Sequence, residues 1–265
     1  MNTFNKTDQA FNFILYGTGR SGSNLLKSLL NQIESVKCYG EIVGKPHVKN
    51  QLGLKSEADF KAKNFQSIND IVKLSIYSKD FETHQYVGMK FFYFHSRFVQ
   101  KLCKDDNPVL KHLSENVKII YSNRTNMVKK TFSRLIAQHK KVFYVRDNAE
   151  EISDKIHVPI DEISATINSD KLTRDYLFDQ IKPEPHNLCT INYEDDLTGM
   201  EKIQDAMERL QLFFYPEREP YPIDEIWTTN KTPLKNNWRE HISNFDELDQ
   251  HYKQDAEIRG MLNEV

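Results

Sequence analysis

The chain has 265 residues, close to the largest size that one hydrophobic core supports, so we expect a single domain over residues 1–265. Its 36 basic and 38 acidic residues give a formal charge of −2, which excludes a general nucleic-acid binder because that class needs a large cationic surface. No run approaches the roughly 18 apolar residues of a membrane span, and the three cysteines are widely spaced, so we expect a cytoplasmic protein without a membrane span.

A strand, a glycine-rich turn and a helix are predicted first. The stretch FNFILY (11–16) is apolar and rich in β-forming residues, and leucines at helical spacing follow the turn. Gly17 and Gly22 fit the first half of the phosphate-binding loop of nucleotide triphosphatases. That pattern continues with Lys and then Ser or Thr, whereas Ser23 and Asn24 stand here. The missing Lys argues against hydrolysis of ATP or GTP.

The same turn also fits the dinucleotide fingerprint G-x-G-x-x-G, through Gly17, Gly19 and Gly22. Glu41 stands 19 residues after Gly22, where an acid that binds a ribose is expected in that class. Against this interpretation, Arg20 occupies a place where the backbone should closely approach a pyrophosphate. A third interpretation is structural, because glycines alone make a tight turn between a strand and a helix.

The residues between the glycines favour an anion site. Arg20, Ser21, Ser23 and Asn24 place a guanidinium, two hydroxyls and an amide at a helix N-terminus, where backbone N–H groups and the helix dipole already attract negative charge. Arg20 can neutralise charge that develops on a bridging oxygen, a task for which magnesium would otherwise be needed. This pattern indicates a phosphosulfate rather than a triphosphate.

Further strands alternate with helices along the chain, which predicts an α/β fold with a P-loop-like, mainly parallel sheet of four to five strands flanked by helices. The strands are predicted at VKCY (36–39), YVGMKFFYF (86–94), VKIIYS (117–122) and NLCTINY (187–193). The polar stretches near 45–85 and 140–182 are expected to be helical excursions over the edge of the sheet, and they are candidates for holding a variable substrate.

Two helices are predicted from apolar residues at helical spacing, and each would pack one face on the sheet. The first includes Leu25, Leu26, Leu29, Leu30 and Ile33. The second includes Val128, Phe132, Leu135, Ile136 and His139. A further helix is expected at MEKIQDAMERLQLFF (200–214), where the family resemblance given below also implies one.

The loop RSGSNLL (20–26) resembles the 5′-phosphosulfate loop of sulfotransferases that use 3′-phosphoadenosine 5′-phosphosulfate (PAPS), especially carbohydrate sulfotransferases and the bacterial glycolipid and trehalose sulfotransferase-like families. The resemblance implies that Gly19, Arg20, Ser21, Gly22, Ser23 and Asn24 bind the cofactor and that Arg20 contacts the bridging oxygen and the sulfuryl group.

Three later segments resemble the same family in the same order. The segment 117–135 is similar to its 3′-phosphate module, a strand that ends in Arg and a helix that carries Ser, with Arg124 and Ser133 in the matching places. NLCTINYEDDL (187–197) resembles the family's Y-E-D-L strand, and 230–248 its C-terminal nucleotide loop. Arg124 and Ser133 are one residue further apart than is usual, so Lys129 and Lys130 remain alternative phosphate contacts.

Transfer of a sulfuryl group to a hydroxyl requires a base that removes the acceptor proton. Glu41, after the first helix, matches the place of a Glu proposed as base in the bacterial glycan families. His95, in the K-x-x-x-x-H layout that begins at Lys90, is similar to the catalytic His of cytosolic small-molecule sulfotransferases. We rank Glu41 first, with His95 as the alternative.

The sequence and the resemblance together predict a PAPS-dependent sulfotransferase that acts directly on a hydroxyl of a carbohydrate or glycolipid and releases adenosine 3′,5′-bisphosphate. No metal is expected, because none of the nine histidines forms a ligand pair at metal-binding spacing. The alternatives are a nucleotide or nucleoside kinase-like enzyme and a nucleotide-binding protein without catalytic activity.

Overall fold

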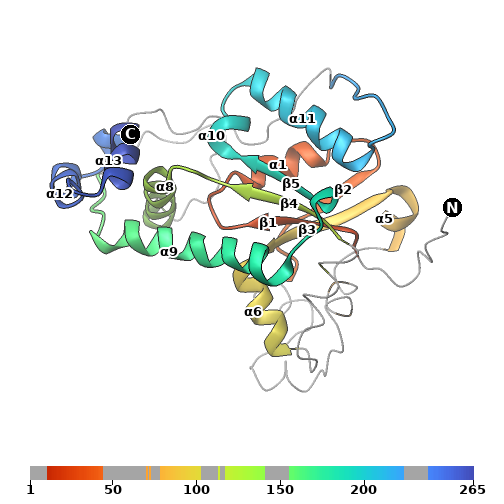
Figure 1. Cartoon of the computed structure of the whole chain (residues 1–265), viewed down its shortest axis with the longest axis horizontal. Coiled ribbons are helices and arrows are strands. Elements are labelled where there is room, and N and C mark those ends of the chain that lie inside the picture. The colour runs from red at the N-terminus through yellow and green to blue at the C-terminus, as the bar shows by residue number, and fades with distance from the viewer. Residues whose placement is uncertain are drawn as a thin grey trace.

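The structure is a computed structural model that describes residues 11–43, 70, 72, 78–102, 113, 117–140, 155–223 and 238–265. Within these ranges the chain forms a central sheet with helices on both faces (Figure 1). The segments 44–69 and 141–154, which belong to the predicted excursions, lie outside the described residues. So does 224–237, which includes the first part of the predicted C-terminal nucleotide loop.

Five parallel strands form the sheet in the order β2-β3-β1-β4-β5. They are β1 (Phe13–Gly17), β2 (Val36–Tyr39), β3 (Tyr86–Phe92), β4 (Lys118–Asn123) and β5 (Leu188–Asn192). Because β1 lies in the middle and all strands run the same way, the loop after β1 leaves the centre of the carboxyl edge. The predicted α/β, P-loop-like fold is confirmed.

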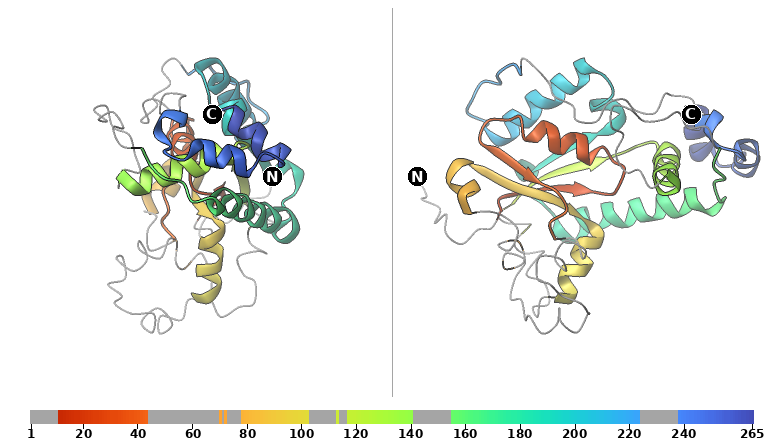
Figure 2. Two further views of the ribbon diagram at one scale, coloured as in Figure 1. Left: turned by 90° about the vertical axis from the view of Figure 1, so that its left-hand side faces the viewer. Right: turned by 180° about the vertical axis from the view of Figure 1, so that it is seen from behind.

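Two helices cover one face of the sheet, as Figures 1 and 2 show: α1 (Ser23–Leu30) and α11 (Met200–Phe214). On the other face lie α6 (Tyr93–Leu102), α9 (Asp161–Asp175) and the π-helical turn Tyr176–Ile181. Further helices among the described residues are α5 (Ser78–Thr83), α8 (Met127–Lys140), α10 (Tyr193–Asp196), α12 (Phe245–His251) and α13 (Ala256–Asn263), with 3-10 turns at Pro185–Asn187 and Trp238–His241.

The alternation of side chains along β1 explains why both faces are covered. Phe13 and Leu15 are buried against α1 and α11, whereas Ile14 and Tyr16 are buried in the core on the opposite face. A strand that is apolar on both faces is typical of a parallel sheet between two layers of helices. The fold therefore presents its polar chemistry at the ends of the strands.

A third cluster of buried residues joins α8 to the C-terminal part of the chain. Val128, Phe132 and Ile136 of α8 pack with Trp238, Phe245 and other apolar residues from α9, α12 and α13. Figures 1 and 2 show α12 and α13 beside α8, at the end of the molecule away from β2. This packing fixes the first turns of α8 beside the glycine loop.

The predicted elements agree with the structure in kind, but their ends differ, and the apolar face of α8 packs on α9, α12 and α13 rather than on the sheet. The strand expected over 86–94 ends at Phe92, and Tyr93 opens α6 instead, while Tyr193 opens α10 rather than ending β5. His139, expected on the packed face of α8, is exposed. The helix predicted over 200–214 and the short strand 36–39 are confirmed.

The described residues of the stretches 45–85 and 140–182 include the helices α5 and α9, whereas Ile156 forms an isolated β-bridge with Ile242. None of the helices among the described residues is long and apolar enough to cross a membrane.

Candidate functional site

The glycine loop connects the central strand to the N-terminus of α1, and two of its glycines are required by the fold. A Cβ at Gly17 would lie 2.5 Å from the carbonyl oxygen of Ser122 on β4. Gly22 has a left-handed φ of 80°, and a Cβ there would lie 2.5 Å from the Tyr193 ring. Gly19 is exposed, and a Cβ there would meet nothing within 4 Å, so the described fold does not require glycine at this position.

Internal hydrogen bonds hold the loop in place. The Ser21 hydroxyl donates to the carbonyl of Thr18 at 2.8 Å, and the Ser122 hydroxyl donates to the carbonyl of Ser21 at 2.7 Å. Ser21 is fully buried, so its hydroxyl stabilises the loop, and any contribution to an anion site would come from its backbone. Arg20 adopts a left-handed φ of 66°, which is uncommon for a residue with a side chain and is typical of binding loops.

The N-terminus of α1 suits a negatively charged ligand. Gly22 caps the helix without a side-chain hydrogen bond, and the first turn contains no acidic residue. Backbone N–H groups at a helix start therefore meet no carboxylate of their own first turn, and the helix dipole adds partial positive charge. Ser23 and Asn24, both predicted to bind the cofactor, lie in this turn.

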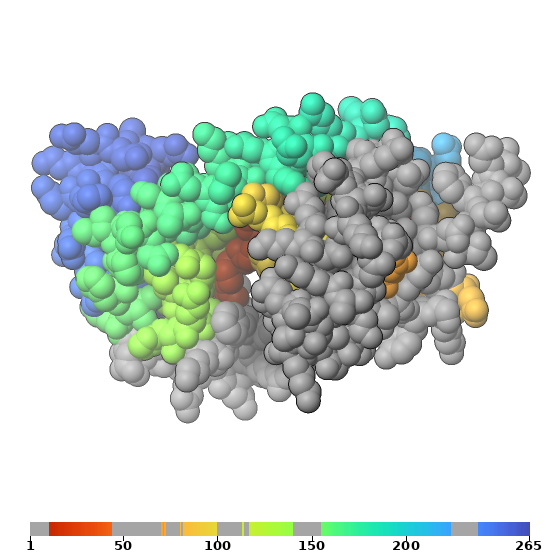
Figure 3. All heavy atoms as spheres, turned by 90° about the horizontal axis from the view of Figure 1, so that it is seen from below, coloured from red at the N-terminus to blue at the C-terminus, as the bar shows by residue number. Residues whose placement is uncertain are grey.

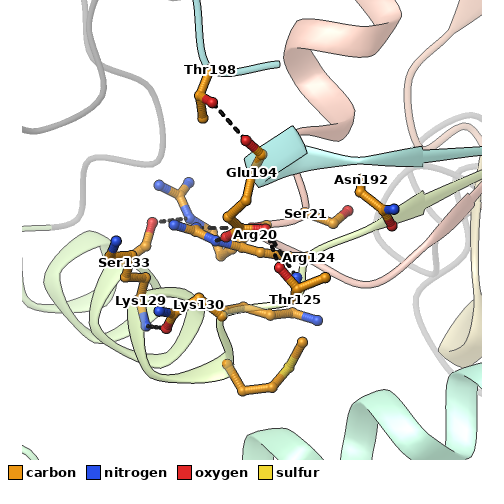
Figure 4. Close-up of polar contacts among 12 residues, drawn as sticks. Arg20, Ser21, Arg124, Thr125, Lys129, Lys130, Ser133, Asn192, Glu194 and Thr198 are labelled. Carbon is orange, nitrogen blue, oxygen red and sulfur yellow. Dashed lines mark hydrogen bonds and ion pairs between the residues drawn. The ribbon is translucent and has the colours of Figure 1, made fainter. Parts of the chain in front are cut away.

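The structure brings the glycine loop together with the second predicted anion motif (Figure 4). Arg20 Nε donates to Ser133 Oγ on α8 at 2.9 Å, across 113 positions of sequence. Arg124, directly after β4, donates through Nη1 to the carbonyl of Arg20 at 3.3 Å. Two guanidinium groups and a hydroxyl from three elements thus meet at the carboxyl edge of the sheet.

Glu194, at the start of α10, orients Arg124. Its Oε1 accepts from Arg124 Nε at 3.0 Å, and its Oε2 accepts from the backbone N–H of Thr125 at 2.9 Å and from the Thr125 hydroxyl at 3.1 Å. The guanidinium also lies over the ring of Tyr193, 4.8 Å from its centroid. Because Arg124 is buried and held on two sides, its direction is largely set by the protein.

Of the two alternative phosphate contacts on α8, Lys130 has a side-chain partner, whereas Lys129 is bonded through its backbone. Lys130 is buried and forms an ion pair with Asp170 of α9, and the same carboxylate accepts from Thr18 of the loop at 3.3 Å. Burial lowers the pKa of Lys130, and the charge of Asp170 opposes that shift. The backbone N–H of Lys129 donates to Asn126, which caps α8. Asp170 of α9 therefore links the loop to α8 through Thr18 and Lys130.

Both candidate bases lie on the other side of the loop and are close to each other. Glu41, just after β2, is 43% exposed in its side chain, and His95, in the first turn of α6, is 1% exposed. Their nearest ionisable atoms, Glu41 Oε2 and His95 Nε2, are 3.8 Å apart. Lys90 of β3 donates to Glu41 Oε1 at 3.2 Å and to Asn24 of α1 at 2.8 Å.

The environment of His95 differs sharply from that of Glu41. The backbone N–H of Phe92 donates to His95 Nδ1 at 3.0 Å, and the ring stacks on Phe92. Burial, with a smaller contribution from the nearby charge of Lys90, lowers the pKa of His95 to about 3. Burial likewise lowers the pKa of Lys90, while Glu41 opposes that shift.

Figure 3 shows that the surface is recessed at part of the N-terminal described segment. Atoms of the N-terminal described segment, in red, are recessed between α8 and α9, in green, and α6, in yellow. Within the described residues, Thr18 of the loop bonds Asp170 of α9 at 3.3 Å and Arg20 bonds Ser133 of α8 at 2.9 Å, so the loop lies beside both helices.

Sequence reasoning did not identify three residues of this site as contacts: Lys90, Asp170 and Glu194. Lys90 carries a signal, since it is a charged residue inside the otherwise apolar stretch VGMKFFYF, and a buried charge needs a partner. Glu194 follows the predicted strand directly but is one of three consecutive acids. Asp170 lies in a polar helix with no distinguishing pattern, so only the fold reveals it.

A scan against protein-family models and a search of curated proteins each found no match to this chain. The function must therefore be inferred from the geometry of the site and from its motifs.

Proposed function

We propose that the protein is a PAPS-dependent sulfotransferase that transfers a sulfuryl group to a hydroxyl of a carbohydrate or glycolipid in the cytoplasm. The observation that carries the proposal is the junction of the two anion motifs. Arg20 of the glycine loop is bonded to Ser133 at 2.9 Å, and Arg124 is bonded to the Arg20 carbonyl at 3.3 Å. A single ligand with a phosphosulfate at one end and a second phosphate near its ribose would meet both motifs.

The donor set fits such a ligand. The N-terminus of α1 and the Arg20 guanidinium provide donors for the phosphosulfate, and Arg124 and Ser133 provide a charged fork and a hydroxyl for the 3′-phosphate. Ser23 and Asn24 stand where an ATP-hydrolysing loop would carry the Lys for the phosphates and the hydroxyl for magnesium. These residues support a metal-free phosphosulfate site over a triphosphate site.

Each residue then has a defined task. When bound, PAPS would supply the sulfuryl group for direct displacement by the acceptor oxygen. Arg20 would stabilise the negative charge that develops on the leaving phosphate. Glu41 would take the proton of the attacking hydroxyl, because its carboxylate is accessible and Lys90 fixes one of its oxygens. Lys90 in turn is held by Asn24, so the base is connected to the first turn of α1.

Transfer of label from PAPS tests the proposal. Purified protein is incubated with ³⁵S-labelled PAPS and a mixture of glycans and glycolipids, and in parallel with labelled ATP and magnesium. We expect labelled sulfate on an acceptor and release of adenosine 3′,5′-bisphosphate, both lost in Glu41→Gln. Phosphate transfer from ATP would support a kinase instead. Tight binding of PAPS with no transfer to any acceptor would support a nucleotide-binding protein without catalytic activity.

A further inference from the structure

A buried polar atom without a hydrogen bond lies beside the proposed base. Among the described residues, His95 Nε2 is the buried side-chain nitrogen or oxygen that lacks a hydrogen-bond partner. A buried donor without a partner costs free energy, so such an atom calls for an explanation. Glu41 Oε2 lies 3.8 Å away, just outside hydrogen-bond range.

The contacts of His95 determine what Nε2 can do. The Phe92 backbone N–H can only donate, so Nδ1 of His95 must be the acceptor in their 3.0 Å bond. A neutral imidazole with an unprotonated Nδ1 carries its proton on Nε2. Because burial holds the pKa at about 3, the ring is neutral at physiological pH. His95 therefore faces Glu41 with an N–H donor and cannot take a proton from an acceptor at that atom.

Glu41 has a donor on its other oxygen as well. Lys90 Nζ binds Oε1 at 3.2 Å, and Lys90 is itself fixed by Asn24. The two potential donors come from different elements, β3 and α6, and approach different oxygens. Lys27 of α1 and Cys38 of β2 are the other titratable groups that act on Lys90.

We propose that His95 is a positioning residue, whose Nε2–H donates to Glu41 Oε2 and, with Lys90 on Oε1, fixes the carboxylate for removal of the acceptor proton. The catalytic part of this assignment rests on the proposed function. The half-exposed Glu41 side chain has room to close the 3.8 Å separation, and catalytic hydrogen bonds are often long before the substrate binds. No proton leaves His95 in the reaction.

Two substitutions separate positioning from base catalysis. In His95→Asn the amide oxygen can accept from Phe92 as Nδ1 does, but no group replaces Nε2–H. In His95→Gln the longer side chain returns an N–H near the position of Nε2. We expect His95→Asn to lower kcat about tenfold, the scale of one hydrogen bond to a charged group, with KM for PAPS unchanged. His95→Gln should recover most of that loss, and His84→Asn, before the start of β3, serves as the control.

The pH profile gives a readout that mere disruption of the fold would not move. Loss of a donor to the Glu41 carboxylate should shift the acidic limb of kcat upward by about one pH unit in His95→Asn and much less in His95→Gln. If both variants are inactive, His95 acts as a base and the assignment is wrong. If His95→Asn has wild-type kcat and the acidic limb of its pH profile is not shifted, the positioning role of His95 is also wrong.

A measurement that needs no turnover keeps this inference separate from the proposed function. In ¹⁵N-histidine-labelled wild type, NMR should show His95 protonated at Nε2, and the Nε2–H signal should move in Glu41→Gln. A proton on Nδ1 of His95 would contradict the hydrogen bond from Nε2–H to Glu41. So would an Nε2–H signal that is unchanged in Glu41→Gln. If PAPS is not turned over at all, the proposed function fails, while the NMR result still decides whether the bond exists.

Discussion

The two sides of the glycine loop each pair a buried cation with a carboxylate, and the two carboxylates differ in exposure. On the side of β2 and β3, a carboxylate that is 43% exposed, Glu41, lies against the buried Lys90. On the side of β4 and β5, Glu194 is the more enclosed partner at 21% exposure and holds the buried Arg124. In each pair the cation is buried, and Glu41 is the carboxylate with the greater exposure to an external molecule.

The difference shows how one sheet edge can support two kinds of chemistry. A buried cation is costly without a partner, so both Lys90 and Arg124 need their carboxylates. Glu194 makes three hydrogen bonds, to Arg124 and Thr125, and so is committed to fixing a guanidinium that lies beside Arg20. Glu41 is held by Lys90 through Oε1, and its side chain is otherwise exposed. We infer that the first side removes a proton and the second side binds an anion.

The largest expected effect is a loss of kcat on substitution of Glu41, the more exposed carboxylate. Glu41→Gln keeps the shape and removes the basic oxygen, so kcat should fall by about 10² to 10⁴, the usual contribution of a general base. Affinity for adenosine 3′,5′-bisphosphate should hardly change, because the base acts on the acceptor. Steady-state kinetics and calorimetric titration measure the two quantities.

Glu34→Gln is the matched control, since Glu34 is an exposed carboxylate before the start of β2, at the opposite edge of the sheet. Activity should stay at the wild-type level there. Full activity in Glu41→Gln would remove this residue as the base.

The next effect concerns Arg20, which lies between the two sides. Arg20→Ala should lower kcat by about 10² to 10³, the scale of losing one donor that stabilises a developing oxyanion. The internal hydrogen bonds of Ser21 and Ser122 remain, so the melting temperature should change little. Arg209→Ala, on the surface of α11, is the control. Wild-type turnover in Arg20→Ala would contradict a role at the leaving group.

On the anion side, the effect should appear in binding. Arg124→Ala should weaken adenosine 3′,5′-bisphosphate by about ten- to a hundredfold, as expected for charge-assisted contacts, and leave 5′-AMP nearly unchanged. The variant leaves Glu194 without its cation, so unfolding by urea is measured alongside to confirm a folded protein. An equal loss for both nucleotides would show that Arg124 does not distinguish them and would leave Lys129 or Lys130 as the contact.

The smallest effect is on stability in acid, and it comes from His95. Its pKa is about 3 in the folded protein and 6.5 when exposed, so the unfolded chain binds more protons between these values and stability falls as pH decreases through that window. The loss should be about 1.4 kcal/mol for each pH unit well below 6.5. Urea unfolding at about pH 5.5 and about pH 4.5 measures it, and His95→Asn should lose less. Identical losses would show that His95 is not buried as a neutral group.

The sequence predicts the fold that carries the site better than it predicts the side-chain contacts within the site. The α/β fold follows from apolar stretches such as FNFILY, because a strand buried on both faces leaves an unambiguous run of apolar residues. Proximity of Glu41 and His95 also follows from the fold, since both come after parallel strands whose carboxyl ends share one edge. The neutral state of His95 depends on burial and on the nearby charge of Lys90, and its tautomer depends on the Phe92 N–H; no local pattern reveals these contacts.

Strand ends were predicted less well, for a related reason. Tyr93 and Phe94 continue an aromatic run, so the pattern extends the strand, whereas the structure starts α6 at Tyr93 and leaves Phe94 exposed. The partner of Lys130 was also beyond prediction, because Asp170 belongs to a helix whose place over the loop depends on the packing of α8 and α9.

The most direct test of the account compares two nucleotides that differ by one phosphate. The central claim is that the glycine loop and the Arg124–Ser133 motif form a single site, which the Arg20 to Ser133 bond of 2.9 Å supports. Calorimetric titration of wild-type protein should give at least about tenfold tighter binding for adenosine 3′,5′-bisphosphate than for 5′-AMP, because the 3′-phosphate gains charge-assisted hydrogen bonds. Equal affinities would contradict the PAPS site and with it the proposed sulfotransferase.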